Sequence, residues 1–447
     1  MMSRLVHESS QPCAKSELDL FVIPATQEMI LGGKWVDVHP IGFSPSDGDV
    51  PLLFEIKGCD DYIDVSQTYI SFKVKFTKAD GTDLVNTDEL GPVNALLYAM
   101  MSQIDMTIAN DLITTLTNLD NYKAIYQLLT NYSPDSLNSL FQCALFYKDT
   151  AGNMDSVKFK EGIDKADVPL WNLGLHARSK FISGSKELTL IGRLTADFFL
   201  QNRYLLDNTD LTIKITRSKN SFCYIGTGDY RLKILGSTLH VRKVQINPEV
   251  RIAHANCLEK SNAKYRLTRV DMKPVSIPKN TRNFYRENLC SGALPSRIIF
   301  GLVDSEAFNG KDNKNPFNFQ NFNLSSVQFQ VESVDIPYKP FETNYANGNY
   351  TEVYFSHFLG VNKTISDSGL IINRNDFANG YALYAFDLSS DLCNQSHFNL
   401  IKNGNLRMVL NFDADTTVNI VCILYLEYQN MIEINKNRQV IFDYNIK

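Results

Sequence analysis

The chain has no long apolar run and none of the cysteine pairs that mark redox or zinc-binding proteins. No apolar run approaches the roughly 18 residues that a membrane helix requires. The eight cysteines stand singly, without a CxxC pair, which argues against a zinc ribbon or a redox motif. No signal-peptide pattern follows Met1. We therefore expect a protein that is soluble and intracellular when made, with cysteines that act as small buried hydrophobic residues.

Sequence motifs of common catalytic sites are also missing. The chain contains no P-loop, no HExxH and no GxSxG motif, and Gly226-Thr227-Gly228 followed by Arg231 breaks the GxGxxG pattern. The seven histidines lie far apart in the sequence, and His240 falls on an alternating strand where a packed or surface position is expected. The sequence thus predicts no enzyme, no catalytic residue, no metal site and no cofactor.

Two clusters of carboxylates come nearest to a metal-site pattern. Asp60-Asp61-Tyr62-Ile63-Asp64 could form a Ca²⁺ loop, but it lacks the spacing and glycine of an EF-hand. A solvated turn before the strand that begins at Thr68 is the favoured interpretation. Asp413 and Asp415 have the pattern of a hairpin turn.

Charge is unevenly distributed along a chain whose net charge is only −5. This balance excludes a strongly basic nucleic-acid-binding protein. Residues 231–286 nevertheless hold thirteen Lys and Arg against three acids, Glu249, Glu259 and Asp271. This stretch could face a polyanion such as packaged DNA. The favoured alternative is the solvent face of strands, balanced by acids elsewhere, because aromatic residues for base stacking are sparse within it.

The sequence is rich in the alternating apolar and polar pattern of half-buried strands. The clearest strand is 68–78, with Ile70, Phe72, Val74 and Phe76 on one face. Further strands are expected at 34–39, 50–56, 103–109, 186–191, 211–216, 230–242, 265–277, 297–303, 327–336, 381–387, 406–412 and 417–428. Helical spacing occurs at 121–146, where Asp120 could cap the first helix and Ser133-Pro134 begins a second. Turns or loops are expected at Asp47-Gly48 and at 151–171, 308–322 and 343–350.

The length of 447 residues exceeds what a single core usually supports, about 250–300 residues. The glycine break at 226–228 lies at the middle of the chain, within the β-rich run 186–244, and we expect two β-sandwiches to meet there. The predicted fold is mainly β, with two tandem antiparallel jelly rolls. The expected domains are an extended N-terminal arm (1–30), a first jelly roll (31–228) with a helical insertion near 121–146, and a second jelly roll with long loops (229–447). No residue-level repeat links the halves, so any duplication is structural only.

Over nearly its whole length the chain resembles the double jelly-roll major capsid (hexon-like) proteins of Polinton/Maverick elements and adintoviruses. The resemblance rests on ordered segments rather than on one motif, and it is weakest at 350–368, where an exposed variable loop is expected. The matching segments are 17–21 with 24–27, 61–66, 91–94, 102–105, Tyr147-Lys148-Asp149-Thr150-Ala151-Gly152, the central block 191–219, Asn315-Pro316-Phe317-Asn318-Phe319, Asn379-Gly380-Tyr381, His397-Phe398-Asn399-Leu400 and 432–444.

The resemblance implies a structural protein of a virion. Three copies would form a pseudo-hexagonal capsomer, and capsomers would assemble an icosahedral shell around a DNA genome. The implied partners are further copies of the chain, a penton protein, minor capsid proteins and, non-specifically, packaged DNA. The arm suits the inner face of the shell, where it could clamp adjacent subunits. Synthesis in the host cytoplasm is expected, with assembly there or in the nucleus.

Two other functions share the predicted fold. A tandem β-sandwich can bind carbohydrate or peptide through its loops, and a hydrolase can hold a pair of carboxylates in a groove between sheets. The mass of the purified protein separates these alternatives, because only the capsid protein is expected to form trimers and larger shells.

Overall fold

The first half of the chain folds into two antiparallel sheets that face each other. The computed structural model describes residues 9–11, 13, 15–45, 50–85, 88–157, 171–332, 334–392 and 397–442. One sheet has the strand order β1-β10-β3-β7 and the other β2-β8-β5-β6. The strands are β1 (Ile30–Val38), β2 (Leu52–Ile56), β3 (Tyr62–Lys78), β5 (Met101–Ile108), β6 (Asp111–Leu112), β7 (Leu188–Arg193), β8 (Leu211–Arg217) and β10 (Tyr230–Ile246), with a separate ribbon of β4 (Leu90–Pro92) and β9 (Tyr224–Gly226).

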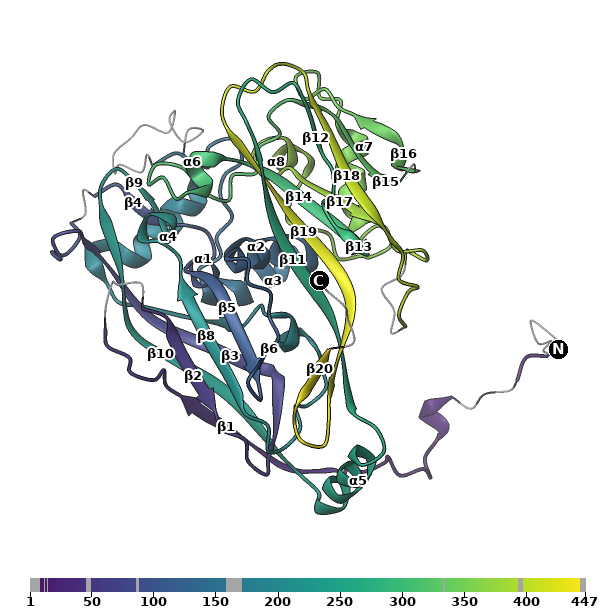
Figure 1. Ribbon diagram of the computed structural model, residues 1–447. Helices are drawn as coiled ribbons and strands as arrows, with labels where there is room; N and C mark the ends of the chain where they lie inside the picture. Colours follow the sequence, from purple (N-terminus) through teal and green to yellow (C-terminus); the bar gives the residue numbers. More distant parts are fainter. Residues whose placement is uncertain are drawn as a thin grey trace.

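The second half builds another pair of antiparallel sheets beside the first (Figure 1). Their strand orders are β11-β19-β14-β17 and β12-β18-β15-β16, with β20 added to β19 and β13 to β18. The strands are β11 (Ala263–Ile277), β12 (Asn283–Arg286), β13 (Ser291–Ala293), β14 (Arg297–Asp304), β15 (Leu324–Val331), β16 (Val334–Glu342), β17 (Leu383–Asp387), β18 (Asn403–Phe412), β19 (Ile420–Ile434) and β20 (Val440–Phe442).

The two halves have the same topology. When the eight main strands of each half are counted in chain order, the sheets read first-eighth-third-sixth and second-seventh-fourth-fifth in both. This double Greek-key order is that of a jelly roll. The predicted fold class, two tandem antiparallel jelly rolls, is confirmed, and the repetition is one of strand order alone.

Side-chain alternation explains why the strands form where they do. On β3, Ile70, Phe72, Val74 and Phe76 are buried, as predicted. The intervening polar side chains are on the other face of the sheet, since successive residues of a strand point to opposite sides.

The boundary expected at 226–228 is wrong. The strand that follows this break, β10, pairs with β3 from Tyr230 opposite Lys78 to Val244 opposite Tyr62, and it pairs with β1 on its other edge. It is therefore the eighth strand of the first jelly roll, and the second begins at β11, after helix α5 (Pro248–Leu258). Alternation shows that a strand exists but not which sheet it joins, because pairing is non-local.

Helices are inserted at the same place in both jelly rolls, between the fifth and sixth strands. The first insertion confirms the predicted helices near 121–146, and Ser133 caps α3 by accepting a hydrogen bond from the Ser136 amide, with Pro134 at the first turn. Asp120, predicted as a cap, instead begins α2 and accepts a hydrogen bond from the Ile104 amide. The helices are α1 (Leu96–Ala99), α2 (Asp120–Asn131), α3 (Pro134–Leu137), α4 (Leu173–Ile182), α6 (Ser305–Phe308), α7 (Thr351–Gly360) and α8 (Arg374–Ala378), besides α5 and short 3₁₀ turns that include η1 (Ser16–Leu18).

The two jelly rolls share one continuous core, although the length had suggested two. Helix α2 lies between them (Figure 1), and all but the last of its residues are buried. The ring of Tyr122 contacts Phe222 of the first half and Phe308 of the second, while Tyr126 packs on Tyr425 of β19. An insertion from the first jelly roll thus fills the space between the sandwiches and makes their apolar interiors continuous.

Other expectations fail for local reasons. The single strand expected at 327–336 is two strands, β15 and β16, which pair with each other. The region 350–368, expected as an exposed loop, contains α7, which packs on β17 through buried residues such as Val353. The Asp47-Gly48 turn and residues 158–170 of the expected 151–171 loop lie outside the described residues.

Candidate assembly surfaces and the junction between the jelly rolls

A fully buried ion pair lies at the junction of the two jelly rolls. Arg178 of α4 donates to Asp149 Oδ1 from Nη2 at 2.6 Å, and neither side chain is exposed to solvent. The same guanidinium donates to the backbone oxygens of Pro92 and Tyr147. Because every charge here has partners, the cost of burying the pair is offset by hydrogen bonds.

Asp149 connects this pair to the second jelly roll. Its Oδ2 accepts a hydrogen bond from Asn315 Nδ2 at 2.9 Å, and its backbone oxygen accepts one from the Tyr381 hydroxyl at 2.9 Å. Nearby, the Gly152 amide donates to the backbone oxygen of Asn379 at 2.7 Å. Three segments far apart in sequence, 147–152, 315–319 and 379–381, therefore meet in one polar network.

Close backbone approach at this network demands glycine. Gly380 has a φ of +118°, and a side chain there would collide with Met154 of the first jelly roll. Beside it, burial raises the pKa of the Asp155 carboxyl, which accepts hydrogen bonds from the Asn315 amide and the Asn318 side chain. The junction joins the two sandwiches through buried polar contacts, which fix the orientation of one sandwich relative to the other.

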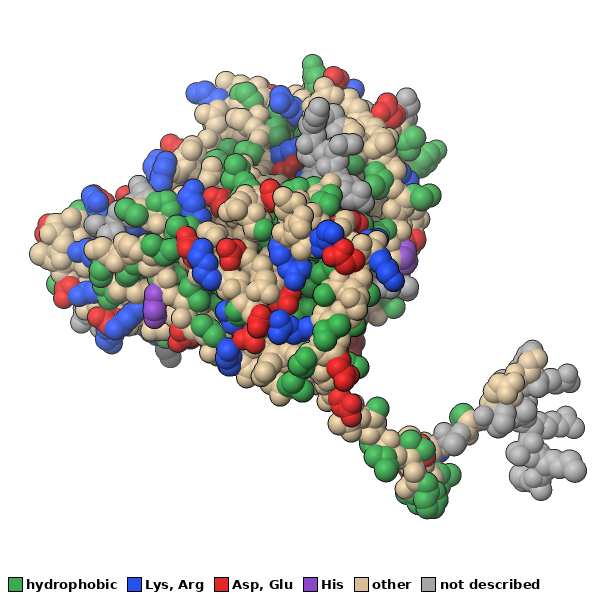
Figure 2. All heavy atoms as spheres, turned by 60° about the horizontal axis from the view of Figure 1, so that its bottom comes forward, with side chains coloured by type: hydrophobic (Ala, Val, Ile, Leu, Met, Phe, Trp, Pro, Cys, Tyr) green, Lys and Arg blue, Asp and Glu red, His purple; other side chains and the backbone are tan. Residues whose placement is uncertain are grey.

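The described part of the N-terminal arm extends away from the body and exposes apolar side chains (Figures 1 and 2). Phe21 and Ile23 are 92% and 88% exposed, and Leu18, Leu20 and Val22 are exposed as well. The arm is held to the body where Asn247 donates from its amide to Met29 O and from its side chain to Glu28 O. A run of apolar residues exposed in this way is typical of a segment that is covered by a partner.

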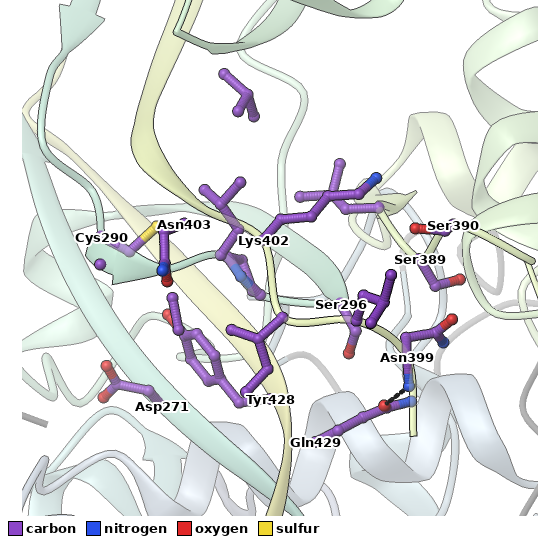
Figure 3. A pocket seen from close by; sticks show the side chains of 18 of the residues that line it. Asp271, Cys290, Ser296, Ser389, Ser390, Asn399, Lys402, Asn403, Tyr428 and Gln429 are labelled. Carbon is purple, nitrogen blue, oxygen red and sulfur yellow. Dashed lines mark hydrogen bonds between the residues drawn. The ribbon is translucent and has the colours of Figure 1, made fainter. Parts of the chain in front are cut away.

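A large pocket lies in the second jelly roll and has a volume of about 1110 Å³. Figure 3 shows Cys290, Lys402 and Tyr428 among the side chains that surround it. We call it the large pocket. Its walls come from β11, β13, β19, the adjoining ends of β15 and β16, and the segment 399–403.

A second, polar pocket of about 650 Å³ lies near the junction. Asn153, Asn318 and Asn379 line it together with Asp155 and Phe322. Two of the side-chain amides already donate hydrogen bonds within the protein. Asn318 donates to Asp155, and Asn379 donates to the backbone oxygen of Asn375.

The carboxylates of 60–64 do not converge. Asp60 pairs with Arg251 and Asp61 with Lys34, while Asp64 accepts hydrogen bonds from Ser66 and Gln67. Asp60 and Asp61 form a bend before β3, as expected, but the strand itself begins at Tyr62. Asp413 and Asp415 lie between β18 and β19, which belong to different sheets, so the expected hairpin turn is wrong and the connection crosses from one sheet to the other.

His240 is a half-buried surface residue. Its ring stacks on Tyr69 with centroids 4.6 Å apart, Nδ1 lies 2.6 Å from Asp37, and Nε2 lies 3.0 Å from Ser71. His7 lies outside the described residues. Within the described parts of the chain, no three metal-ligating side chains gather into a group that could hold an ion.

The basic stretch 231–286 is spread over several elements of both jelly rolls. It runs through β10 of the first jelly roll, α5, and then β11 and β12 of the second, which belong to three different sheets. Several of its cations have local partners, such as Arg251 with Asp207, Lys264 with Glu433 and Lys273 with Asp271. This arrangement favours the interpretation of locally balanced strands.

The cysteines only partly match the expectation. Cys223, Cys290 and Cys422 are buried, but the side chains of Cys13, Cys143 and Cys257 are exposed, and Cys59 is intermediate. The seven are free thiols, and Cys393 lies outside the described residues. Of the helices in the described residues, none combines the length and apolar character needed to cross a membrane.

Comparison with known proteins places the fold among viral capsid proteins. A chain of the Sputnik virophage, solved by cryo-electron microscopy, aligns with a TM-score of 0.65 at 11% identity, over 100% of this chain and 95% of its own. The mavirus major capsid protein aligns at 0.55 and 12% identity, over 100% and 97% of the two chains. The Faustovirus major capsid protein aligns at 0.54 and 8% identity, over 93% of each.

By sequence, the chain is 21% identical over 442 residues to an uncharacterized protein of Caenorhabditis elegans. The alignment covers 94% of this chain and 99% of the relative. No protein-family model matches the chain. The chain thus has a double jelly-roll fold, which it shares with these viral capsid proteins.

Proposed function

We propose that the chain is a major capsid protein whose copies assemble the shell of an icosahedral virus or virus-like element. The observation that carries the proposal is the repeated strand order. Two jelly rolls of the same topology stand side by side in one chain, locked by the polar network around Asp149, and their structural neighbours align over nearly their whole lengths. A rigid pair of similar sandwiches is suited to packing side by side with further copies of itself.

Trimerisation follows from the same proposal. Three double jelly rolls give six sandwiches around one axis, the number needed for a pseudo-hexagonal capsomer. Such capsomers would enclose a DNA genome and would contact a penton protein and minor capsid proteins. The proposal places the protein in the virion, made in the host cytoplasm and assembled there or in the nucleus. The finer assignment to Polinton/Maverick elements and adintoviruses rests on the segment resemblance.

The rigid junction supports this role in physical terms. Interfaces between subunits bury about 800 Å² per partner in a standard case, and only matching, pre-organised surfaces do so without a large entropic cost. The buried Arg178–Asp149 pair and the continuous core fix the two sandwiches as one body before assembly.

The test is the assembly state of the purified protein. We expect a stable trimer of about three times 50.7 kDa that forms larger closed particles, measured by mass photometry and electron microscopy. A protein that stays monomeric at all concentrations would contradict the proposal.

A carbohydrate-binding protein is the second candidate, because the 650 Å³ polar pocket is lined by amides and a carboxylate, groups that bind sugar hydroxyls. Binding of a glycan by a monomer, lost on substitution of Asn318 but not of an asparagine outside the pocket such as Asn347, would favour it.

A further inference from the structure

Within the chain, the two jelly rolls meet through unlike surfaces. The first jelly roll contributes its fifth strand, β6, and helix α2 of the insertion that follows it. Asp111 of β6 accepts a hydrogen bond from the Val440 amide of β20 at 3.3 Å. Tyr126 of α2 donates from its hydroxyl to the backbone oxygen of Ile423 in β19 at 2.9 Å. The second jelly roll therefore contributes the sheet that contains β11, β19, β14 and β17, with β20 at its side.

The face of this sheet that covers α2 is the outer one. Phe300 of β14 packs on Phe329 of the opposite sheet with ring centroids 5.9 Å apart, and it pairs with Leu424 of β19. Paired residues of neighbouring strands point to the same side of a sheet, and successive residues of one strand point to opposite sides. Leu424 thus points into the sandwich, whereas Tyr425, whose ring stacks on Tyr126 at 5.9 Å, points out of it.

Surfaces of the same two kinds recur at the outer sides of the pair. By strand order, β16 and α7 of the second jelly roll correspond to β6 and α2 of the first. The sheet β1-β10-β3-β7 likewise corresponds to β11-β19-β14-β17. Figure 1 shows β16 and α7 on the side of the second jelly roll remote from the first, and β1 and β10 on the side of the first remote from the second. One chain therefore presents one surface of each kind outward.

The surface formed by β16 and α7 exposes large apolar side chains. Phe355 and Leu359, one turn apart on α7, are 59% and 46% exposed, and Tyr338 of β16 is 96% exposed. The opposite side of α7 is buried through Val353 and Gly360, among others. A helix with apolar residues all round is normally buried on every side. We therefore expect a partner to cover the outward side of α7.

The outer face of the sheet β1-β10-β3-β7 exposes rings and aliphatic side chains as well. Trp35 of β1 is 46% exposed, and Ile191 of β7 is 41% exposed. On the strands between them, the ring of Tyr69 lies 5.1 Å from Trp35 and stacks on His240 at 4.6 Å. Tyr69 points outward because Ile70, the next residue, is buried in the sandwich. Aromatic side chains on an otherwise polar face are typical of the centre of a protein interface.

The charges of the two surfaces are opposite in sign. Strands β1, β3, β7 and β10 carry nine Lys and Arg against two Asp. Four of the lysines pair with acids from adjoining segments, and with these acids counted the cations still exceed the acids by three. The four pairs are Lys34–Asp61, Lys73–Glu187, Lys75–Asp83 and Lys78–Asp88. On β16 and α7, three acids stand against one lysine, and they are Asp335, Glu342 and Glu352 against Lys339. This balance favours contact between the two surfaces.

We propose that β16 and α7 of one copy pack on the outer face of the sheet β1-β10-β3-β7 of the next copy. The inference rests on the proposed function, because it names the surfaces that hold the trimer together. In a ring of six sandwiches, first and second jelly rolls alternate, so each contact from first to second lies within a chain and each contact from second to first lies between chains. A contact between unlike surfaces closes into a ring when its rotation does.

The test mixes two variants, each damaged on one surface. The helix variant carries Phe355→Lys and Leu359→Lys, and the sheet variant carries Trp35→Lys and Ile191→Lys. Each places charge where the proposal buries apolar side chains. Ile252→Lys, at a side chain of α5 that is 62% exposed and belongs to neither surface, is the matched control. Circular dichroism establishes that each variant is folded, and mass photometry at one concentration gives its assembly state.

We expect the control to form the parent's trimer and each double variant to be monomeric by itself. A one-to-one mixture of the two double variants should form dimers of about twice 50.7 kDa. The intact sheet of the helix variant then meets the intact helix of the sheet variant, and the ring cannot close because both remaining surfaces are damaged. Phe355→Lys and Ile191→Lys, each alone, repeat the comparison with a smaller change to each fold.

Three other results would overturn the proposal. Folded variants that keep the parent's trimer would show that the contact lies on other surfaces, and the capsid function would stand. Variants that are monomeric alone and stay monomeric when mixed would show that these two surfaces do not meet each other, again without affecting the parent's trimer. A parent protein that forms no trimer would remove both the inference and the proposed function.

Discussion

The buried ion pair at the junction gives the sharpest test of how the two jelly rolls are held together. Replacing Arg178 with Met keeps much of the aliphatic volume but removes the donors to Asp149, Pro92 O and Tyr147 O. Asp149 keeps hydrogen bonds from Asn172 and Asn315, but its charge loses the compensating cation. All these groups remain away from solvent.

The expected cost follows from that burial. Removing one partner of a buried ion pair typically destabilises a protein by about 3–5 kcal/mol, because a charge is left uncompensated. For a chain of this size we expect the melting temperature to fall by about 5 °C or more. Adding Asp149→Asn to Arg178→Met removes the stranded charge, so the double variant should recover at least about 1 kcal/mol of the loss.

Thermal unfolding followed by circular dichroism measures these effects. Lys436→Met is the control. It also removes a cation, but from an exposed ion pair with Glu259 at 2.9 Å, and such a pair contributes only about 0–1 kcal/mol to folding stability. If Arg178→Met melted within one degree of the parent protein, as the control should, the junction would not depend on this pair and our account of its rigidity would be wrong.

Four further predictions concern pH, packing and the arm. His357 is fully buried in α7, and burial lowers its pKa to about 4. The neutral ring therefore contributes to folding stability above pH 6.5, and this contribution is lost as pH falls toward 4. Urea titrations should show that His357→Leu removes about 2 kcal/mol of the acid destabilisation between pH 7.5 and 5. Burial raises the pKa of Asp120 to about 6. The neutral carboxyl therefore contributes to folding stability below about pH 4, and this contribution is lost as pH rises through 6. Asp120→Asn should gain about 1–3 kcal/mol of unfolding free energy over the parent between pH 4 and 7, and equal pH profiles of stability for the two proteins would refute this. Gly360→Ala should lower the melting temperature, since a Cβ there would lie 2.5 Å from the Ala385 backbone, while Gly369→Ala, in open space, should not. Deleting residues 1–30 should leave trimers intact by mass photometry but prevent shell closure in electron micrographs; loss of the trimer would mean that the arm is misplaced.

Strands were predictable because their pattern is local. The alternation of Ile70, Phe72, Val74 and Phe76 follows from one buried face, and it needs no knowledge of partners. The sheet that each strand joins is a long-range property. Thus β10 was expected to open the second sandwich, although its pairing with β3 makes it the last strand of the first.

Helix α2 shows a second limit of local pattern. Lys123 and Gln127 are polar, yet both are buried, because Lys123 pairs with Asp197 at 2.7 Å and the helix is enclosed by two sandwiches. Neither the enclosure nor the shared core could be derived from spacing. The junction residues were visible only as segments of a resemblance, and their contact across the chain, as between Asp149 and Asn315, emerges only in three dimensions.

The central claim is that this double jelly roll builds a closed shell from trimers. Electron microscopy of the purified, full-length protein, with its mass measured in parallel, tests it most directly. We predict three-copy capsomers of about three times 50.7 kDa and closed icosahedral particles made from them. A uniform monomer that forms neither, under conditions where the protein is folded, would contradict the claim.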